Sequence, residues 1–149
     1  MKYKPEDLAY LAGIIDGEGC IGIYPNKNKT VNLGVTHRMS IQVGMCDIEA
    51  VQFIHQIFGG SMQSYKGSTS NRRVRHHWLI ASRQAQTLLR EVLPYLKTKS
   101  KQAELAIEFQ DLFYKGRAKI TDEDFKLRQG YVTKLKQLKH GANWKEAGG

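Results

Sequence analysis

The sequence predicts an α+β domain in which one four-stranded antiparallel sheet carries helices on one face. Two kinds of pattern indicate this class. Four segments alternate apolar and polar residues, as strands do when one face of their sheet is buried, and five segments repeat apolar residues at helical spacing. Their order is helix, two strands, helix, two strands and then further helices, which is typical of a sheet with its helices on one side. The 149 residues fit a single domain over residues 1–149.

The first helix is predicted to begin at Pro5 and to end near Asp16. Proline suits the first helical turn, and the acidic residues 6 and 7 complement the positive end of the helix dipole. Glycines at positions 17 and 19 then end the apolar repeat. Within the helix, Gly13 costs about 1 kcal/mol relative to alanine. A close approach of another backbone would explain it, and tight packing within one chain is the alternative.

The later elements follow from the same rules. Asp47 is suited to cap a helix over Ile48–Phe58, which the Gly59-Gly60 pair ends. The four strands are predicted over Cys20–Tyr24, Val35–Met45, Ser61–Tyr65 and Arg72–Ala81. The remaining helices are predicted from Arg83 to about Leu96 with a bend or break at Pro94, over Lys99–Tyr114, and over Thr121–Lys139. Residues 143–149 are expected to form a frayed tail.

Composition excludes several classes of protein. The chain has no apolar run near the roughly 18 residues that a membrane span needs. Two cysteines, Cys20 and Cys46, are too few for a disulfide scaffold, and no set of cysteines and histidines has zinc spacing. The N-terminal segment lacks the layout of a signal peptide, so we expect an intracellular protein, in the cytoplasm or an organelle.

The distribution of charge indicates a polyanionic partner. The net charge is +9, and residues 19–90 contain nine Lys or Arg but only two acidic residues. Residues 91–149 hold twelve basic and eight acidic residues, which is the mixture of a solvated surface. The middle of the chain is therefore predicted to face the polyanion, although a basic surface without a specific partner has the same composition.

The polar parity of the strands is predicted to form a DNA-binding face. Arginine and glutamine match the donors and acceptors of base edges in the major groove, and lysine and arginine neutralise phosphates. The side chains expected on this face are Tyr24, Arg38, Ser40, Gln42, Gln63, Tyr65, Arg73, Arg75 and His77. Four lysines are also expected to bind DNA, of which the last two neutralise its phosphate backbone: Lys27, Lys29, Lys97 and Lys101.

One short motif carries a sharper signal. Residues 11–19 read LAGIIDGEG, and six of the nine are identical to the signature of the LAGLIDADG homing endonucleases, which this sequence resembles. The predicted element order and the basic segment LPYLKTKSKQA over residues 93–103 are also similar to that family. The resemblance covers about residues 6–114, which we take as the core, with a helical extension over residues 115–142.

The motif places two carboxylates where a helix ends. Asp16 and Glu18 are near a helix C-terminus, whose dipole disfavours anions, so a cation should compensate them. A bound Mg²⁺ suits carboxylate oxygens, whereas solvation or pairing with Lys99 is the alternative. The resemblance implies that Glu18 holds Mg²⁺ or another divalent cation such as Mn²⁺, that the Gly17 carbonyl assists, and that Asp16 is structural.

The resemblance implies roles for two further positions. Lys99 falls at the family's basic position near the scissile phosphate, where it would stabilise charge or polarise the attacking water. An ordinary phosphate contact or a solvated lysine is the alternative. Many relatives carry a polar residue at the end of the second strand, where it orders the attacking water. Met45 occupies that position and cannot do so.

The motif occurs once, so the resemblance implies a homodimer. Two first helices would pack around a two-fold axis through small residues and bring two copies of Glu18 together. The predicted interface residues are Ala9, Ala12, Gly13 and Asp16. A two-fold protein reads a two-fold sequence, so the expected partner is double-stranded DNA with a long, nearly palindromic site.

The predicted function is that of an intron-encoded homing endonuclease. It would make a staggered double-strand break by metal-dependent hydrolysis of phosphodiester bonds. The alternative is a nucleic-acid binder on the same scaffold that does not cleave, such as a splicing maturase or a regulator.

Overall fold

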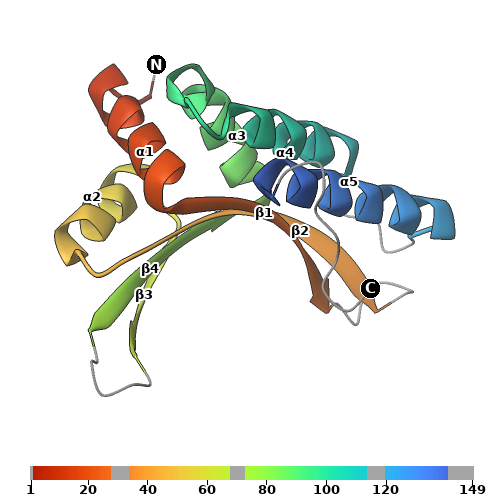
Figure 1. Ribbon diagram of the computed structural model, residues 1–149, viewed down its shortest axis with the longest axis horizontal. Helices are drawn as coiled ribbons and strands as arrows, with labels where there is room; N and C mark the ends of the chain where they lie inside the picture. Colours follow the sequence, from red (N-terminus) through yellow and green to blue (C-terminus); the bar gives the residue numbers. More distant parts are fainter. Residues whose placement is uncertain (1, 28–33, 68–72, 114–119, 141–149) are drawn as a thin grey trace.

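The computed structural model describes residues 2–27, 34–67, 73–113 and 120–140. Its elements follow the predicted order (Figure 1). In chain order they are α1 (Pro5–Glu18), β1 (Gly19–Lys27), β2 (Val35–Met45), α2 (Ile48–Phe58), β3 (Ser61–Lys66), β4 (Val74–Ala81), α3 (Ser82–Val92), the short 3₁₀ helix η1 (Leu93–Tyr95), α4 (Ser100–Phe113) and α5 (Asp122–His140).

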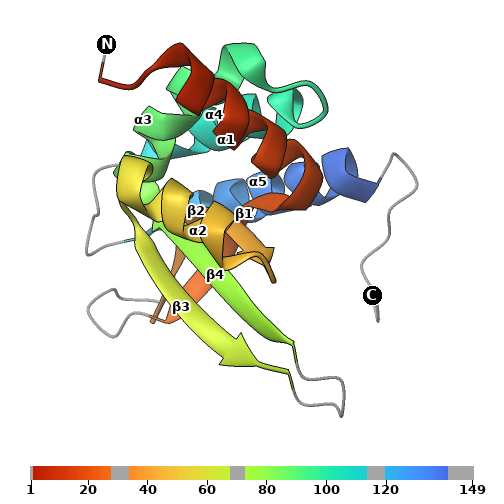
Figure 2. The ribbon, with the colours of Figure 1, turned by 90° about the vertical axis from the view of Figure 1, so that its left-hand side faces the viewer.

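The strands form one antiparallel sheet in the order β1-β2-β4-β3. Two hairpins are therefore joined side by side through β2 and β4. The register pairs Gly19 with Val43 and Gly44 with His77, which aligns the start of β1 with the end of β2. The helices lie over one face of the sheet, and the other face is curved and open (Figures 1 and 2). The predicted α+β class is thereby confirmed.

The hydrophobic core lies between the sheet and the helices. The strands bury one parity of side chains, and Ile41 and Trp78 in the two central strands are 0% exposed. From the helices, α1 contributes Leu11 and Ile15 to the same cluster. Asp47 caps α2 as predicted, because its carboxylate accepts hydrogen bonds from the amides at positions 49 and 50.

Two predicted boundaries are wrong. Helix α1 continues to Glu18, two residues past the predicted end, because Gly17 is accommodated in the helix and Gly19 serves as its C-cap. Strand β1 continues through Pro25 to Lys27, because β1 is an edge strand and such a strand tolerates a residue without an N–H. The start predicted for the fourth strand and the tail over residues 143–149 lie outside the described residues.

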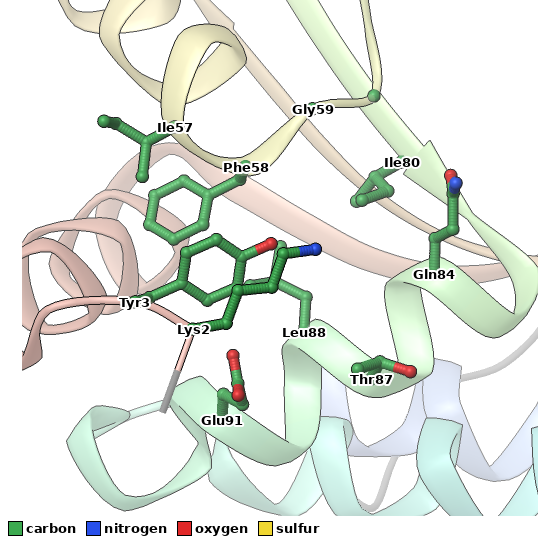
Figure 3. Close-up of a pocket in the computed structure, with 11 residues that line it drawn as sticks. Lys2, Tyr3, Ile57, Phe58, Gly59, Ile80, Gln84, Thr87, Leu88 and Glu91 are labelled. Carbon is green, nitrogen blue, oxygen red and sulfur yellow. The ribbon is translucent and has the colours of Figure 1, made fainter.

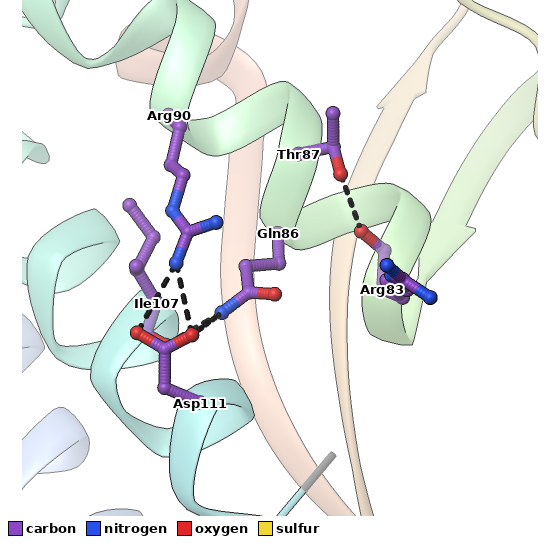
Figure 4. A network of polar contacts seen from close by, with 6 residues as sticks. All are labelled: Arg83, Gln86, Thr87, Arg90, Ile107 and Asp111. Carbon is purple, nitrogen blue, oxygen red and sulfur yellow. Dashed lines mark hydrogen bonds and ion pairs between the residues drawn. The ribbon is translucent and has the colours of Figure 1, made fainter. Parts of the chain in front are cut away.

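The helices beyond the strands are joined by polar contacts. The break predicted at Pro94 is present as η1. In Figure 4, Asp111 of α4 accepts hydrogen bonds from Arg90 (2.9 and 3.1 Å) and from Gln86 (2.8 Å), both in α3. Helix α5 is fixed to β2 by Arg128, whose Nη1 donates to Thr36 Oγ1 at 3.0 Å. None of the described helices has the length and apolar character that crossing a bilayer requires.

The turn after α2 generates a prediction about stability. Gly59 and Gly60 have φ of +78° and +80°, but only Gly60 lies against backbone, where an added Cβ would be 2.6 Å from the Leu79 carbonyl oxygen. Gly59→Ala should cost about 1–3 kcal/mol of unfolding free energy from the backbone alone, because its φ of 78° and ψ of −147° lie in a region that residues with a side chain rarely adopt. Gly60→Ala should cost more, because overlap adds to the same strain. Urea denaturation of both variants checks this, and equal losses would contradict the overlap.

Candidate functional site

The end of α1 is bound to the segment that precedes α4. The Asp16 carboxylate accepts hydrogen bonds from the backbone amides of Lys97 (2.8 Å), Thr98 (3.2 Å) and Lys99 (3.1 Å). It also accepts one from the Thr98 hydroxyl at 3.1 Å. Asp16 is therefore engaged within its own chain, which agrees with the structural role that the sequence resemblance implied for it.

These contacts favour the charged form of Asp16. Burial alone would raise the pKa of its carboxyl, but the hydrogen bonds from Lys97, Thr98 and Lys99 outweigh burial and hold the pKa below its ordinary value. The carboxylate is thus ionised at neutral pH and compensates the basic segment around it.

The Lys99 side chain in turn donates hydrogen bonds to the end of α1. Its ammonium donates to the carbonyl oxygens of Ile15 (2.9 Å) and Gly19 (2.6 Å), so it satisfies carbonyls at the C-terminus of α1. An ammonium has three N–H donors. Within the part of the chain that the structure describes, two acceptors contact this ammonium, which leaves one donor for a ligand beside the end of α1.

Glu18 is exposed at the last position of α1. Among the described residues, no side chain pairs with its carboxylate, and no group of three His, Cys, Asp or Glu could hold a metal ion. Whether the junction of α1 and β1 can hold a divalent cation therefore depends on the oxygen donors that it offers. An exposed carboxylate and the neighbouring backbone carbonyl of Gly17 are hard oxygen donors, which suit Mg²⁺ or Mn²⁺ but do not complete its coordination.

Near the junction of α1 and β1, the structure brings together residues that the sequence analysis did not predict. Lys139, in the last turn of α5, donates to Cys20 Sγ at 3.2 Å, and that thiol also contacts the Tyr24 hydroxyl at 3.2 Å. Burial would raise the pKa of Cys20, but Tyr24, Lys139 and the charge of Lys99 outweigh it and lower the pKa. Burial and the contact with Cys20 raise the pKa of Tyr24. No local pattern links positions 20 and 139.

The open face of the sheet presents most of the predicted DNA-binding side chains. Exposed members are Tyr24, Lys27, Arg38, Gln63, Tyr65, Arg73 and Arg75, and the basic segment adds exposed Lys97 and Lys101. Gln42 and His77 are half-buried on the same face. Ser40 is only 3% exposed, so it cannot offer the surface predicted for it. Lys29 lies outside the described residues.

Side chains on this face hold one another in place. The Tyr65 hydroxyl donates to Gln63 Oε1, and the Tyr65 ring lies edge-on to His77 with centroids 5.2 Å apart. Gln42 donates to Ser40 Oγ at 3.3 Å, which explains how the serine is covered. The Arg75 guanidinium donates to the Gly44 carbonyl at 2.9 Å.

The same face is hollowed beside these side chains. A hollow of about 260 Å³ is lined by Gln42, Ser61, Gln63, Tyr65, His77, Trp78 and Leu79. A second, of about 210 Å³, is lined by Tyr24, Pro25, Asn26, Arg38, Ser40, Gln42 and Leu79. The two hollows share Gln42 and Leu79, so they are neighbours on the open face. Groups of a ligand could enter them.

Another hollow, of about 380 Å³, lies between the N-terminal residues, the end of α2 and α3 (Figure 3). The rings of Tyr3 and Phe58 pack there with centroids 5.0 Å apart, and Glu91 points toward Lys2. None of the residues predicted for the site lines this hollow, so we do not include it in the site.

The predicted interface residues divide between two sides of α1. Ala9 and Gly13 are exposed together with Gly17, and nothing described lies within 4 Å of a Cβ added at either glycine. Ala12 is 0% exposed in the core, so its place in the predicted interface is wrong. The exposed strip of Ala9, Gly13 and Gly17 remains available for a second helix.

Met45 lies at the end of β2 and packs against the core cluster. It therefore offers no polar group to the end of α1, as its residue type predicted. The open-face parity at this end of β2 belongs instead to Gly44, which has no side chain.

Comparison with known proteins supports the geometry. The family model described as LAGLIDADG endonuclease matches residues 11–114. The homing endonuclease I-CvuI, in complex with its target in the presence of Ca, is similar with a TM-score of 0.74 and 22% identity over 94% of this chain and 86% of that chain. The archaeal intron-encoded homing endonuclease I-Vdi141I, complexed with DNA, has a TM-score of 0.73 and 14% identity over 95% and 88%.

A third structure, of the homing endonuclease I-TnaI, is similar with a TM-score of 0.63 and 20% identity over 93% of this chain and 95% of that chain. At these identities the likeness shows the fold. A search of curated protein sequences found no match.

The Asp16 contacts predict a pH-dependent stability difference. Asp16→Ala should lower the unfolding free energy at pH 7 by about 1–3 kcal/mol, because four donors lose a charged acceptor. The folded-state pKa is depressed, so this stabilisation is present above the ordinary pKa near 3.9 and is lost as pH falls through the folded value. Urea titrations of wild type and variant from pH 7 to 3 should converge, and a constant difference would contradict the assignment.

Proposed function

Since this chain belongs to the LAGLIDADG endonuclease family, we propose that it is a site-specific endonuclease that cleaves both strands of double-stranded DNA as a homodimer. The observation that carries this proposal is the position of Glu18. Glu18 is exposed at the last position of α1, next in the chain to Gly19, whose carbonyl accepts a hydrogen bond from the Lys99 ammonium and which begins the basic sheet. An acidic side chain close to a surface that binds a polyanion weakens that binding, so the presence of Glu18 needs a chemical reason.

A divalent cation would supply that reason. Glu18 and the Gly17 carbonyl of each protomer would hold Mg²⁺ or Mn²⁺. Further oxygens would come from the junction of α1 and β1 in the second protomer and from DNA. When bound, such an ion activates water and offsets the negative charge that develops on phosphate during hydrolysis. The structures of relatives obtained with Mg or Ca are consistent with this requirement.

The chain's own residues perform the other tasks. The open face carries Arg38, Gln42 and Arg75 toward base edges, and the exposed Lys97 and Lys101 neutralise phosphates. The remaining N–H of Lys99 donates to an oxygen of the scissile phosphate, while its other contacts hold the end of α1. A water oxygen then bonds to phosphorus and loses a proton to solvent, while the bond between phosphorus and the sugar oxygen breaks and that oxygen takes up a proton from solvent.

The exposed strip on α1 supports dimerisation. Ala9, Gly13 and Gly17 present almost no side chain, so a second α1 could approach closely around a two-fold axis. Each protomer would bring one Glu18 to one strand of the duplex, and the two cuts would be staggered. The DNA site should then be long and nearly palindromic.

A second function is favoured by one observation. Met45 packs against the core, so the end of β2 gives no polar side chain to the water beside Glu18. A chain of this family that binds nucleic acid without cutting, such as a splicing maturase or a regulator, would not need one. Whether the gene lies in an intron is also a prediction, which the DNA that flanks it would test.

Glu18→Gln separates binding from cleavage. The variant should lose cleavage by orders of magnitude and keep its affinity for DNA, because it removes the charge that attracts the cation and leaves the sheet face intact. The assay uses a duplex selected from a randomised library by binding to the wild type in Ca²⁺. Cleavage is then measured in Mg²⁺ and in Mn²⁺.

Glu6→Gln is the matched control, because Glu6 is exposed at the other end of α1. Lys99→Met should slow cleavage less than Glu18→Gln does, and it should also destabilise the fold, since two carbonyls lose their donor. A Glu18→Gln variant that cuts at the wild-type rate would refute the assigned ligand. A wild type that binds the selected duplex but never cuts it would favour the maturase or regulator.

Gly13→Leu tests the dimer. A leucine on the exposed strip should separate the two α1 helices, so light scattering should give the chain mass of 17.0 kDa in place of twice that value. Double-strand cleavage should be lost with it. Gly130→Leu is the control, since Gly130 is another helical glycine with open space around it. A monomeric wild type that makes double-strand breaks would disprove the arrangement.

A further inference from the structure

At the end of β2 that is paired with the start of β1, one side chain of β4 lies over the sheet. The register pairs Gly19, the first residue of β1, with Val43, so Gly44 is the next residue of β2 at the end of the sheet where α1, which ends at Glu18, runs into β1. Gly44 in turn pairs with His77 on β4. Adjacent strands are about 4.8 Å apart, so His77 lies one strand spacing from Gly44, at the end of β2 that is paired with the start of β1.

The space above Gly44 is filled by side chains of β4. A Cβ added to Gly44 would lie 2.9 Å from Cε1 and 3.1 Å from Nδ1 of His77, and 3.2 Å from Nη2 of Arg75. The His77 ring therefore leans across Gly44, toward β1 and away from its own strand. A larger residue at position 44 would push it back.

The ring packs against one neighbouring side chain, and a second neighbour fixes the backbone beneath it. The Tyr65 ring lies edge-on to it at 5.2 Å, and Arg75 is anchored by its hydrogen bond to the Gly44 carbonyl at 2.9 Å. His77 is half-buried, so it is packed and still reachable from the open face. Its nitrogens provide a donor and an acceptor of hydrogen bonds.

We propose that His77 is a catalytic residue of the cleavage centre, where a ring nitrogen hydrogen-bonds the attacking water and orients it toward phosphorus. Arg75 is a positioning residue, because it fixes the backbone over which the ring lies. The water oxygen bonds to phosphorus and gives a proton to solvent, and the bond to the leaving sugar oxygen breaks while that oxygen takes a proton from solvent, so His77 is unchanged. This inference rests on the proposed function and gives the site the polar group that Met45 lacks.

The test separates orientation of water from reading of bases. Affinity for the duplex selected in Ca²⁺ and single-turnover cleavage in Mg²⁺ at saturating protein are measured for His77→Ala, His77→Gln and Gly44→Ala. His77→Ala should slow cleavage about 100-fold, as loss of positioning does, and change affinity less than threefold. His77→Gln should recover part of the rate, because it restores a hydrogen-bonding group.

Gly44→Ala provides an independent variant, because it keeps the imidazole and displaces it, together with the nearby Arg75 guanidinium. It should slow cleavage in the same direction, with thermal unfolding showing that the fold is retained. His55→Ala is the control, since His55 lies on α2, away from the open face. It should change neither quantity.

Each other outcome has a meaning. Altered affinity or base preference with an unchanged saturated rate would make His77 a base-reading side chain and overturn the proposal. Unchanged rate and affinity in His77→Ala would overturn it as well. If the wild type cuts and the His77 variants cut equally fast, only this inference fails. A wild type that binds and does not cut in Mg²⁺ or Mn²⁺ refutes the proposed function and this inference with it.

Discussion

An exchange of hydrogen bonds between two helix ends holds the rest of the site in place. The C-terminus of α1 offers carbonyls that have no partner within the helix, and Lys99 supplies an ammonium to two of them. The segment before α4 offers amides, and Asp16 supplies a carboxylate to three of them. Each charge lies where the facing helix end favours it. Because α1 runs directly into β1, this exchange also fixes the start of the sheet and the position of Glu18.

The sequence was sufficient for the order of elements and for the inward and outward parity of the strands, because both depend on local periodicity. Boundaries that depend on tertiary position were not predictable. Pro25 signals a break unless its strand is known to lie at an edge, and Gly17 signals a helix end unless Gly19 is known to cap it. The alternation of residues along a strand predicts which face of the sheet a side chain is on, but not how far neighbouring side chains cover it. Ser40 was therefore placed on the correct face and assigned too much exposure.

The candidate site divides in the same way. The motif locates Glu18 and Lys99, since residue type and spacing carry that signal. It does not locate Lys139, which reaches Cys20 across 119 positions. For Ala12, two patterns conflicted: its small side chain fitted the interface strip, whereas its spacing from Leu8 fitted the core. In the structure Ala12 is buried in the core, where its small side chain lets α1 lie close to its neighbours.

The open arrangement of the sheet has a consequence for solubility. With the order β1-β2-β4-β3, the outer strands β1 and β3 each have one side unpaired within the sheet. Such edges invite strands of other molecules and lead to aggregation. Pro25 removes one donor from the β1 edge, and Lys27 and Lys66 place a charge at the end of each outer strand. The residues that end the strands thus also discourage growth of the sheet from one molecule to the next, which would otherwise cover the open face.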